Sequence, residues 1–445
     1  MSALDALFKA YDIRGTVPDQ FDAAIARRIG AAFAIFSGAP TILLGRDMRP
    51  SGVGLAAAFA EGAMAQGSDV VDLGLASTDL VYFASGRLDA PGVMFTASHN
   101  PAAYNGIKLC LAGAKPVGED TGLGTIKELA GTDHPPAARQ GVRSERDLLD
   151  EFAAHVRSFV DVGALRPLKV VADTANGMGG YVAPRVFDGL PFEVEYLYQE
   201  LDGTFPNHPA DPIQPENLRD LQARVLATGA DIGLAFDGDA DRVFLVDERA
   251  ELVSGSLTTA LLAKAILARS PGSTILHNLI CSKAVPEVIL EQGGVPVRTR
   301  VGHSFIKQVM LETGAAFGGE HSAHYYFRDN YRADSGLIAS MIVLEQLSVS
   351  GRPLSELIAP LDRWRASGER NTPVADPHAV IDRIAAEFAG AAQDRLDGLT
   401  VDLGDWWFNL RPSNTEPLLR LNLDARTREE CDARTTELLA RIREG

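Results

Sequence analysis

The chain has 445 residues, which is too many for one ordinary hydrophobic core and predicts several domains. Its formal net charge of −17 at pH 7 argues against nucleic acid or an anionic membrane surface as a partner, because both attract a positive field. A small anionic substrate is compatible with this charge, since a pocket can hold local positive charge within an acidic protein.

The three cysteines, Cys110, Cys281 and Cys431, are far apart and lack the spacing of metal or redox sites, which suits a reducing compartment. The N-terminal residues lack the apolar stretch of a signal peptide, and no segment is apolar for long enough to span a bilayer. We therefore expect a cytoplasmic protein, monomeric or weakly dimeric, with no membrane or nucleic-acid partner.

Short apolar runs alternate with helical patterns through most of the chain, which predicts α/β domains with largely parallel sheets. In the first unit, residues 1–143, the run TILLGRD at 41–47 predicts a buried strand and residues 52–67 predict a helix. The second unit, residues 144–249, opens with the strand-like run LKVVAD and a glycine-rich turn. It closes in the order helix, strand, acidic loop, strand.

The third unit, residues 250–358, starts with a helical pattern and continues through the strand-like runs STILHNLI and VPVRTRVG. The fourth unit, residues 359–445, has a different order, with one helical pattern, three strand-like runs and a terminal helix. We therefore predict an α/β fold of three tandem mixed-sheet α/β domains, followed by a smaller C-terminal α+β domain.

The acidic loop in FDGDADR places Asp237, Asp239 and Asp241 at alternate positions. Such residues project to one side of an extended or tightly looped backbone, so their carboxylates can converge. Three hard anionic ligands suit Mg²⁺ or Ca²⁺, and carboxylates crowded together without a cation would repel one another. The loop therefore predicts a divalent-metal site rather than a solvated turn.

The same loop resembles a calcium-binding EF-hand, because Glu248 follows at the twelfth position. An EF-hand needs glycine at the sixth position, where this chain has Arg242, and it needs helices where apolar runs here predict strands. A non-catalytic calcium-binding protein is the weaker alternative, and such a protein has no use for the serine motif described next.

The stretch GVMFTASHNPAAYNGIKL ends a buried strand shortly before Ser98, which lacks the Gly-x-Ser-x-Gly elbow of serine hydrolases. The Asn-Gly dipeptide at 105–106 predicts a tight turn. Such a turn would bring Lys108 back towards Ser98 and His99. A hydroxyl, an imidazole and an ammonium beside a metal loop suit phosphoryl transfer, although an isolated serine of this kind can also belong to an ordinary loop.

Two further motifs offer groups for phosphate and sugar. The N-terminal YDIRG contains Tyr11 and Arg14, and a guanidinium can fork onto phosphate oxygens. In GGEHSAHYYF, alternation along an extended segment would place Glu320, Ser322 and His324 on one side, where they can bind sugar hydroxyls. A half-buried strand with polar outward residues is the alternative for this segment.

The motif RPSNTEP lies between two predicted strands and combines a guanidinium, two hydroxyls and an amide in one loop. Together with exposed backbone N–H groups, these side chains would form a cradle for a phosphate group. The residues of this cradle are Arg411, Ser413, Asn414 and Thr415.

TASHNP with YNGIK, DGDADR, GEHSAH and RPSNTEP, in this order, resemble the α-D-phosphohexomutase family and within it the phosphomannomutase/phosphoglucomutase branch. The resemblance covers essentially the whole chain. It implies four domains around a central cleft and an intramolecular phosphotransferase, which is an isomerase. It also implies that a phosphoserine donates its group to a hexose monophosphate and is restored from the resulting hexose 1,6-bisphosphate.

By this resemblance Ser98 is the phosphoserine. The implied Mg²⁺ ligands are Ser98, Asp237, Asp239 and Asp241. The other implied catalytic residues are Arg14, His99, Lys108 and Arg242. The base is either His99 or Lys108, with Lys108 preferred, and Arg242 either bridges phosphoserine and substrate or only pairs with the acidic loop.

The resemblance also assigns residues to substrate binding, namely Tyr11, His303, Glu320, Ser322, His324, Arg411, Ser413, Asn414 and Thr415. Two positions depart from the family pattern. Ile280 stands where many relatives carry lysine, and Ala323 stands where bacterial relatives usually carry glycine. Both departures bear on the choice of sugar.

The form of the motif GEHSAHYYF favours mannose as the sugar. We predict a phosphomannomutase that interconverts mannose 6-phosphate and mannose 1-phosphate, with Mg²⁺ as cofactor and a hexose 1,6-bisphosphate as activator and intermediate. Glucose phosphates are further candidate substrates, and phosphoglucomutase or phosphoglucosamine mutase are the alternatives. This reaction requires an accessible Ser98 beside the three aspartates of the acidic loop.

Overall fold

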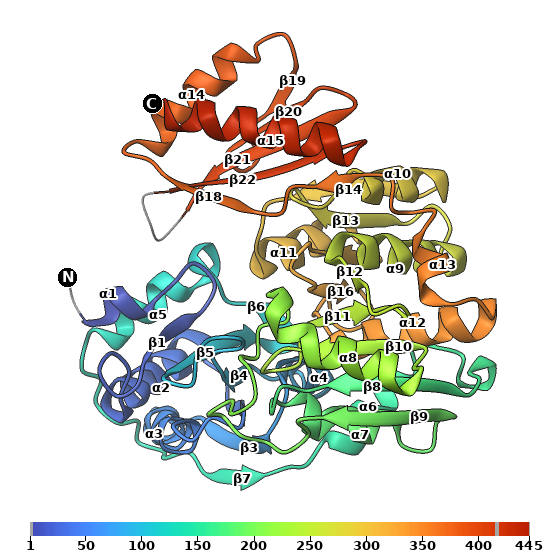
Figure 1. Ribbon diagram of the computed structural model, residues 1–445. Coiled ribbons are helices and arrows are strands. Elements are labelled where there is room, and N and C mark those ends of the chain that lie inside the picture. Colours follow the sequence, from blue (N-terminus) through green and yellow to red (C-terminus); the bar gives the residue numbers. More distant parts are fainter. Residues whose placement is uncertain (1–2, 414–417, 445) are drawn as a thin grey trace.

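The structure, a computed structural model, describes residues 3–413 and 418–444. Four units, each with its own sheet, follow one another in an arc, so that the N-terminal unit at the lower left and the C-terminal unit at the top flank a gap (Figure 1). The predicted fold class is confirmed in this arrangement. Among the helices described, none combines the length and the apolar character needed to cross a bilayer.

The first unit is built on a mixed sheet in the order β1-β5-β4-β2-β3-β7, with β6 beside β5. The pairs of β2 with β3 and β4 are parallel, whereas β1 and β4 pair with β5 antiparallel. The strands are β1 (Ile13–Thr16), β2 (Thr41–Arg46), β3 (Asp69–Leu75), β4 (Gly92–Phe95), β5 (Tyr104–Leu111), β6 (Lys115–Pro116) and β7 (Arg143–Glu145). The helices are α1 (Ala3–Leu7), α2 (Ala23–Ser37), α3 (Gly52–Ala65), α4 (Thr78–Leu88) and α5 (Leu123–Ala130).

The second unit has the sheet order β12-β11-β10-β8-β9, in which β10 and β11 form an antiparallel hairpin and β8 pairs in parallel with β9 and β10. Its strands are β8 (Leu168–Asp173), β9 (Phe192–Leu197), β10 (Ile232–Phe236), β11 (Val243–Val246) and β12 (Leu252–Val253). Its helices are α6 (Leu149–Arg157), α7 (Gly179–Phe187) and α8 (Arg219–Thr228).

The third unit has the sheet order β14-β13-β15-β16, with only the β15–β16 pair antiparallel among these strands. Its strands are β13 (Thr274–Asn278), β14 (Val295–Thr299), β15 (Phe317–Gly319) and β16 (Tyr325–Phe327). Its helices are α9 (Gly255–Arg269), α10 (Ala284–Glu291), α11 (His303–Thr313), α12 (Gly336–Ser350) and α13 (Leu354–Ile358).

The fourth unit has an antiparallel sheet in the order β17-β22-β21-β20-β19, with β18 also beside β22. Its strands are β17 (Arg365–Ala366), β18 (Arg370–Pro373), β19 (Ala392–Asp394), β20 (Leu399–Asp402), β21 (Trp406–Pro412) and β22 (Leu418–Ala425). Its helices are α14 (Pro377–Glu387) and α15 (Arg428–Arg443). The predicted α14, the three strands β20, β21 and β22, and the terminal α15 are present, and the structure adds β17 and β18 before α14 and β19 after it.

One large hydrophobic cluster joins the first three units, and the main cluster of the fourth unit is separate from it. One continuous cluster runs from Phe83 of α4 through Phe152 of α6 and Val171 of β8 to Leu337 of α12. A distinct cluster lies between the sheet and the two helices of the fourth unit. Shared apolar burial therefore fixes the first three units against one another.

Short edge strands extend the first two sheets. β7 adds residues 143–145 to the first sheet, and β12 adds residues 252–253 to the second. The boundaries predicted near Arg143 and Arg249 therefore separate these two strands from their sheets: β7 has no apolar residue, and β12 is only two residues long. As domain limits, the boundaries near Arg143, Arg249 and Ile358 stay predictions.

The predicted tight turn at Asn105 and Gly106 is wrong, because both residues lie inside β5 and pair with β1. The chain reverses earlier, in the loop between β4 and β5. Gly106 serves the close packing of strands instead, since a Cβ on it would lie 2.3 Å from the carbonyl oxygen of Ile13. Strand pairing, with Lys108 opposite Met94, is what returns the lysine towards the serine.

Candidate active site

The serine and the aspartates of the acidic loop meet at the boundary between the first two units. Ser98 lies in the serine loop, residues 96–103, which follows β4. The loop from β10 to β11 carries Asp237, Asp239 and Asp241. Ser98 Oγ donates a hydrogen bond to Asp237 Oδ2 at 2.7 Å.

The three carboxylates converge, because their ligand atoms lie within 4.8 Å of one another. They are also almost completely buried, with exposed fractions of 0% for Asp237, 0% for Asp239 and 1% for Asp241. The acidic loop joins two antiparallel strands rather than two helices, so the EF-hand alternative is wrong.

Two cations lie against these carboxylates. Lys108 Nζ donates to Asp239 Oδ2 at 2.7 Å and to Asp241 Oδ2 at 2.6 Å, while Arg242 Nε donates to Asp237 Oδ2 at 3.0 Å. Burial alone would lower the pKa of Lys108, but the two carboxylates outweigh it and hold that pKa well above its usual value. Lys108 is therefore an ammonium group in this arrangement.

The acidic loop fits a divalent cation on two grounds. Among the described residues, Lys108 and Arg242 pair with the three buried carboxylates and His324 lies 3.7 Å from Asp241, yet burial, with the charges of Asp239 and Asp241, still raises the pKa of Asp237 despite Arg242. In addition, Oδ1 of Asp239 and Oδ1 of Asp241 are buried without a hydrogen bond from the described residues. Hard oxygen ligands with unsatisfied negative charge are what Mg²⁺ binds.

The expectation that Ser98 is accessible is wrong in this arrangement, because Ser98 is buried, with 4% of its surface exposed; it does lie beside the carboxylates as expected. Its φ of 50° is in the left-handed region, and its hydroxyl lies 3.3 Å from Nδ1 of His99. Burial, followed by the charges of Arg242 and Arg14, lowers the pKa of His99 well below its usual value. The residue next to the serine is therefore a neutral imidazole.

The N-terminal motif lies against the serine loop and the third unit. The guanidinium of Arg14 donates through Nη1 to the side-chain oxygen of Asn100 and through Nη2 to Asp12. The hydroxyl of Tyr11 donates to the carbonyl oxygen of Val301 at 3.0 Å, which ties the first unit to the third. The structure thus brings both predicted residues of this motif to the junction of the units.

The sugar loop, residues 320–324, is a turn between β15 and β16, so the extended segment predicted for it is wrong. The backbone N–H of Glu320 donates to the carbonyl of His324, and that of Ala323 donates to the carbonyl of Glu320, each at 3.0 Å. Ala323 has a φ of 66°, in the left-handed region that favours glycine, the residue expected there from the family resemblance.

Glu320 is buried and engaged within the third unit. Its Oε1 accepts from the Gly302 backbone N–H and from Asn278 Nδ2, each at 3.2 Å, and its Oε2 accepts from the Tyr326 hydroxyl at 2.8 Å. A sugar hydroxyl would have to share this carboxylate with the protein. Ser322 lies at the tip of the same turn and is half-buried.

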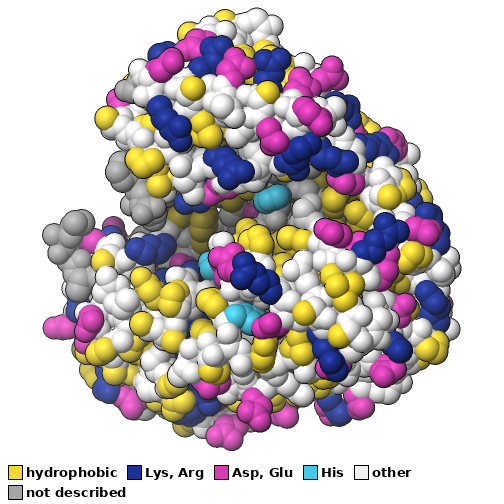
Figure 2. All heavy atoms as spheres, viewed as in Figure 1, with side chains coloured by type: hydrophobic (Ala, Val, Ile, Leu, Met, Phe, Trp, Pro, Cys, Tyr) yellow, Lys and Arg dark blue, Asp and Glu magenta, His cyan; other side chains and the backbone are white. Residues whose placement is uncertain are grey.

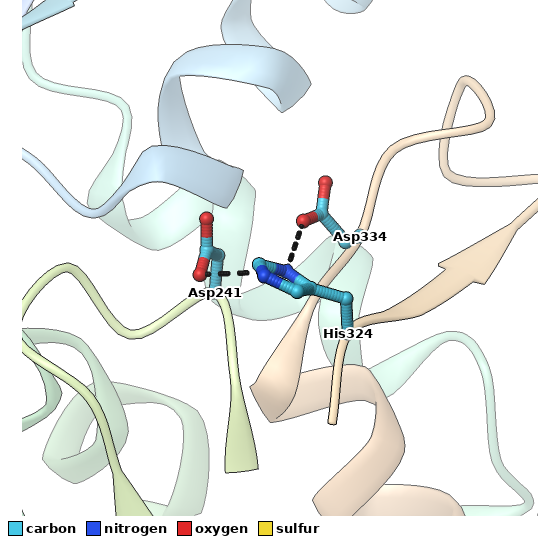
Figure 3. Close-up of side chains that lie close together, drawn as sticks. All are labelled: Asp241, His324 and Asp334. Carbon is cyan, nitrogen blue, oxygen red and sulfur yellow. Dashed lines mark hydrogen bonds and ion pairs between the residues drawn. The ribbon is translucent and has the colours of Figure 1, made fainter. Parts of the chain in front are cut away.

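His324 links the sugar loop to the acidic loop, as Figure 3 shows. Its Nδ1 lies 2.8 Å from Asp334 Oδ2 and 3.7 Å from Asp241 Oδ1. Burial opposes its protonation, but Asp241 and Asp334 outweigh burial and raise the pKa of His324. Asp334 also pairs with the buried Lys307 of α11, whose Nζ lies 2.9 Å from Asp334 Oδ1.

The predicted phosphate cradle lies in the fourth unit at the β21–β22 hairpin. Arg411 pairs with Arg420 across the strands, and Glu369 accepts from both guanidiniums at 3.0 Å. Arg420 Nη2 also donates to Ser413 Oγ at 3.4 Å. The other predicted members, Asn414 and Thr415, lie outside the described residues, and so does the side chain of His303, whose backbone begins α11.

Figure 2 shows the surface hollowed between the C-terminal unit at the top and the N-terminal unit below it. Three loops of the first three units meet through the contacts of Ser98, Asp241 and His324 described above, whereas the cradle belongs to a unit with its own core. This arrangement places three buried carboxylates and a serine hydroxyl in the first two units, and a pair of guanidiniums in the fourth.

Family models match four successive parts of the chain. Residues 5–133, 150–251 and 254–363 match α/β/α domains I, II and III of phosphoglucomutase/phosphomannomutase, and residues 369–441 match the C-terminal domain. The chain belongs to the phosphoglucomutase/phosphomannomutase family. The resemblance stated from the sequence motifs is confirmed.

Relatives of this phosphohexomutase match over nearly their whole length. A Xanthomonas campestris pv. campestris protein named "Phosphohexose mutases" is 42% identical over 94% of this chain and 95% of its own length. A Salmonella montevideo phosphomannomutase is 41% identical, with coverage of 97% and 98%. A phosphoglucomutase/phosphomannomutase family protein of Burkholderia thailandensis has a TM-score of 0.89 at 34% identity, with coverage of 99% and 97%. The enzyme is an isomerase of the intramolecular phosphotransferase type.

Sequence reasoning missed several residues around the site of this phosphohexomutase. Thr78, at the start of α4, donates through Oγ1 to Asp239 Oδ2 at 2.5 Å. Asp334, Lys307 and Arg420 contact predicted site residues or their partners, as described above. No local spacing could reveal these four, because tertiary packing and strand register bring them to the site; the register of β21 and β22, for example, pairs Arg411 with Arg420.

Asp79 gives a pH-dependent prediction. It is fully buried between α4 and α12, where the hydroxyls of the helix-capping Ser77 and Ser335 donate to it, and burial raises its pKa to about 7. Ionisation of Asp79 therefore lowers the stability of the folded state. This loss of stability grows as the pH rises from 3.8, the pKa in the unfolded chain, to about 7, the pKa in the folded protein. Replacing Asp79 with asparagine should remove a penalty of up to about 4 kcal/mol above pH 7 and little at pH 4.

The measurement is the thermal midpoint of wild type and Asp79→Asn between pH 4 and pH 8. The thermal midpoint of Asp79→Asn relative to wild type should increase as the pH rises. Asp19→Asn changes an exposed carboxyl, and its thermal midpoint should equal that of wild type at each pH. A constant gap between Asp79→Asn and wild type over this range contradicts the prediction.

Proposed function

We propose that this enzyme is a phosphomannomutase that interconverts mannose 6-phosphate and mannose 1-phosphate through a phosphoserine at Ser98. The contact of 2.7 Å between Ser98 Oγ and Asp237 of the acidic loop carries this proposal, because a phosphoryl group on Ser98 would then lie beside the carboxylates that would hold a cation. The choice of mannose is supported by the relatives named phosphomannomutase at about 40% identity over most of the chain.

Asp237, Asp239 and Asp241, together with an oxygen on Ser98, would hold Mg²⁺. When bound, Mg²⁺ offsets the negative charge of the transferring group and makes the serine oxygen a better leaving group. Lys108 and Arg242 remain beside the same carboxylates and would bind phosphoryl oxygens from the protein side.

In the first transfer, the bond between phosphorus and Ser98 Oγ breaks as a bond forms between phosphorus and a sugar hydroxyl oxygen, whose proton passes to a side-chain base. The product is a hexose 1,6-bisphosphate. In this first transfer Ser98 Oγ takes a proton from Asp237 or His99, the groups nearest to it. After the intermediate reorients, its other phosphoryl group returns to Ser98, whose proton goes back to the same group, while the side-chain base returns its proton to the sugar oxygen that has lost phosphorus. The enzyme is then phosphorylated again and the sugar phosphate is isomerised.

We assign the proton transfer at the sugar to His324 in place of Lys108. Two carboxylates hold the pKa of Lys108 well above its usual value, so Lys108 stays protonated and suits the binding of phosphoryl oxygens. Carboxylates also raise the pKa of His324, but from the much lower starting value of an imidazole, which can still exchange a proton. Asp334 binds Nδ1 of His324 and so fixes the ring, which leaves Nε2 as the nitrogen that can face a substrate hydroxyl.

The cradle of Arg411, Arg420 and Ser413 would bind the phosphate that is not transferred. Both guanidiniums now share the carboxylate of Glu369, so an incoming phosphate would compete with that carboxylate for the same donors. The cradle must accept either phosphate of the bisphosphate, which two forked guanidiniums allow because they bind the phosphate and not the sugar.

The experiment compares initial rates with mannose 1-phosphate, glucose 1-phosphate and glucosamine 1-phosphate, each with and without a hexose 1,6-bisphosphate. We expect the highest kcat/KM with mannose 1-phosphate, lower activity with glucose 1-phosphate, and activation by the bisphosphate. A higher kcat/KM with glucose 1-phosphate would make the enzyme a phosphoglucomutase, an activity that the name of the family also includes. A preference for glucosamine 1-phosphate would assign it to amino sugars.

A further inference from the structure

Arg49 is fully buried, with 0% exposed, in the connection from β2 to α3. Its Nη1 donates to the carbonyl oxygens of Pro101 at 2.8 Å and Tyr104 at 2.9 Å. Its Nη2 donates to the carbonyl oxygens of Ser98 at 2.9 Å and Asn100 at 2.6 Å. One guanidinium therefore binds four carbonyl groups in and next to the serine loop.

The remaining donor of Arg49 is also engaged. Nε donates to Asp47 Oδ2 at 3.2 Å, and Asp47 Oδ1 accepts from the Arg49 backbone N–H at 2.9 Å. A guanidinium has five N–H donors in a rigid plane, so this geometry uses the whole fork. Because buried polar groups that lose their partners are strongly unfavourable, the serine loop cannot shift without breaking several of these bonds together.

The second unit closes over Arg49. The ring of Phe205 lies 5.1 Å from the guanidinium carbon, and a Cβ on Gly203 would lie 2.6 Å from Arg49 Cα. The Ser98 carbonyl that Arg49 binds also packs on the acidic loop, since a Cβ on Gly238 would lie 2.4 Å from that oxygen. Arg49 thus holds Ser98 in its left-handed conformation at the point where the serine and acidic loops touch.

We propose that Arg49 is a positioning residue for phosphoryl transfer, which fixes the serine loop so that Ser98 Oγ stays aligned with the acidic loop. This inference rests on the proposed function, because the alignment matters for turnover only if Ser98 carries the phosphoryl group. The contacts of Arg49 lie in the first two units, whereas the sugar loop and the cradle lie in the third and fourth. Loss of Arg49 should therefore affect kcat rather than KM.

The test is Arg49→Lys, which keeps the positive charge but replaces the planar fork by one ammonium. We expect kcat per folded molecule to fall about 10²-fold, the effect of a small misplacement of a reacting group. KM for mannose 1-phosphate should change less than about threefold. The rate at which water removes phosphate from Ser98, followed by intact mass, should change as well, which lower stability alone does not explain.

Arg157→Lys is the matched control. Arg157 also binds backbone carbonyl oxygens, those of Arg185, Val186 and Asp188, at 2.6 to 2.8 Å, but it lies in the second unit away from the acidic loop. Its replacement should lower the thermal midpoint and leave kcat per folded molecule unchanged. A kcat for Arg49→Lys within about threefold of this control overturns the proposal.

If Arg49→Lys does not fold, Gly203→Ala decides the matter, because its methyl group presses on the Arg49 backbone and removes no hydrogen bond. We expect at least about a 10-fold lower kcat than in Gly54→Ala, where an added Cβ meets nothing within 4 Å. Equal kcat in the two variants overturns the role of Arg49. Wild-type enzyme without phosphate on Ser98 would instead overturn the proposed function, so the two failures are distinguishable.

Discussion

Replacing Ser98 with alanine is expected to abolish turnover, with a loss in kcat of at least about 10⁴-fold, as when a covalent nucleophile is removed. The structure gives the reason: the Ser98 hydroxyl is the group that contacts Asp237 in the acidic loop, and the neighbouring His99 has no hydroxyl to replace it. Intact mass should show a phosphorylated fraction in purified wild-type enzyme that is missing from Ser98→Ala.

Ser340→Ala is the control for this experiment. Ser340 is also fully buried, but its hydroxyl only donates to the carbonyl of Gly336 within α12. This variant should keep both the phosphorylated fraction and the activity. A phosphorylated fraction that persists in Ser98→Ala, or turnover near the wild-type rate, would place the transferred group on another residue and remove the proposed mechanism.

Replacing Asp239 with asparagine should give the second largest effect, a loss of about 10³-fold in Mg²⁺-dependent kcat. Neutralising one of three carboxylates weakens the cation site and also changes its contacts with Lys108 and Thr78. Because Asp239 is fully buried, some loss of stability should accompany the loss of activity. The measurement is activity after chelation of metal with EDTA and titration with Mg²⁺.

Asp247→Asn provides the comparison in the same unit. Asp247 is 6% exposed and accepts backbone hydrogen bonds from Arg249 and Glu251 in the turn after β11, outside the acidic loop. Its replacement should alter stability but leave the Mg²⁺ titration as in wild type. If Asp239→Asn titrates with Mg²⁺ as Asp247→Asn does, Asp239 is not a metal ligand.

The local order of elements could be predicted from the sequence because it depends on short-range patterns. The run at residues 41–47 contains β2, and the acidic loop falls between β10 and β11 as the flanking apolar runs indicate. The antiparallel pairing of these two strands removes the EF-hand alternative, which the loop composition alone had left open. Convergence of the three aspartates followed from their alternate spacing and the tight loop.

Two predictions were wrong because the same short sequence is compatible with more than one backbone conformation. The dipeptide at 105–106 is common in tight turns, but here the glycine allows β1 to approach β5. Glu320, Ser322 and His324 alternate in the sequence, yet they lie in a turn whose backbone hydrogen bonds close between residues 320 and 324. In both cases the packing of neighbouring strands decided between conformations that the sequence permits.

By itself, the amino-acid sequence determined the order of strands and helices, the convergence of the three aspartates in the acidic loop, and the family, since each depends on residues close together in the chain. Only the tertiary structure decided which other side chains contact the serine loop, the aspartates and His324. Arg49 binds the serine loop about fifty residues away, Lys108 pairs with Asp239, and Asp334 holds His324 against the acidic loop. Most such contacts join residues far apart in the chain, and burial of the shared core, rather than any spacing along the chain, brings them together.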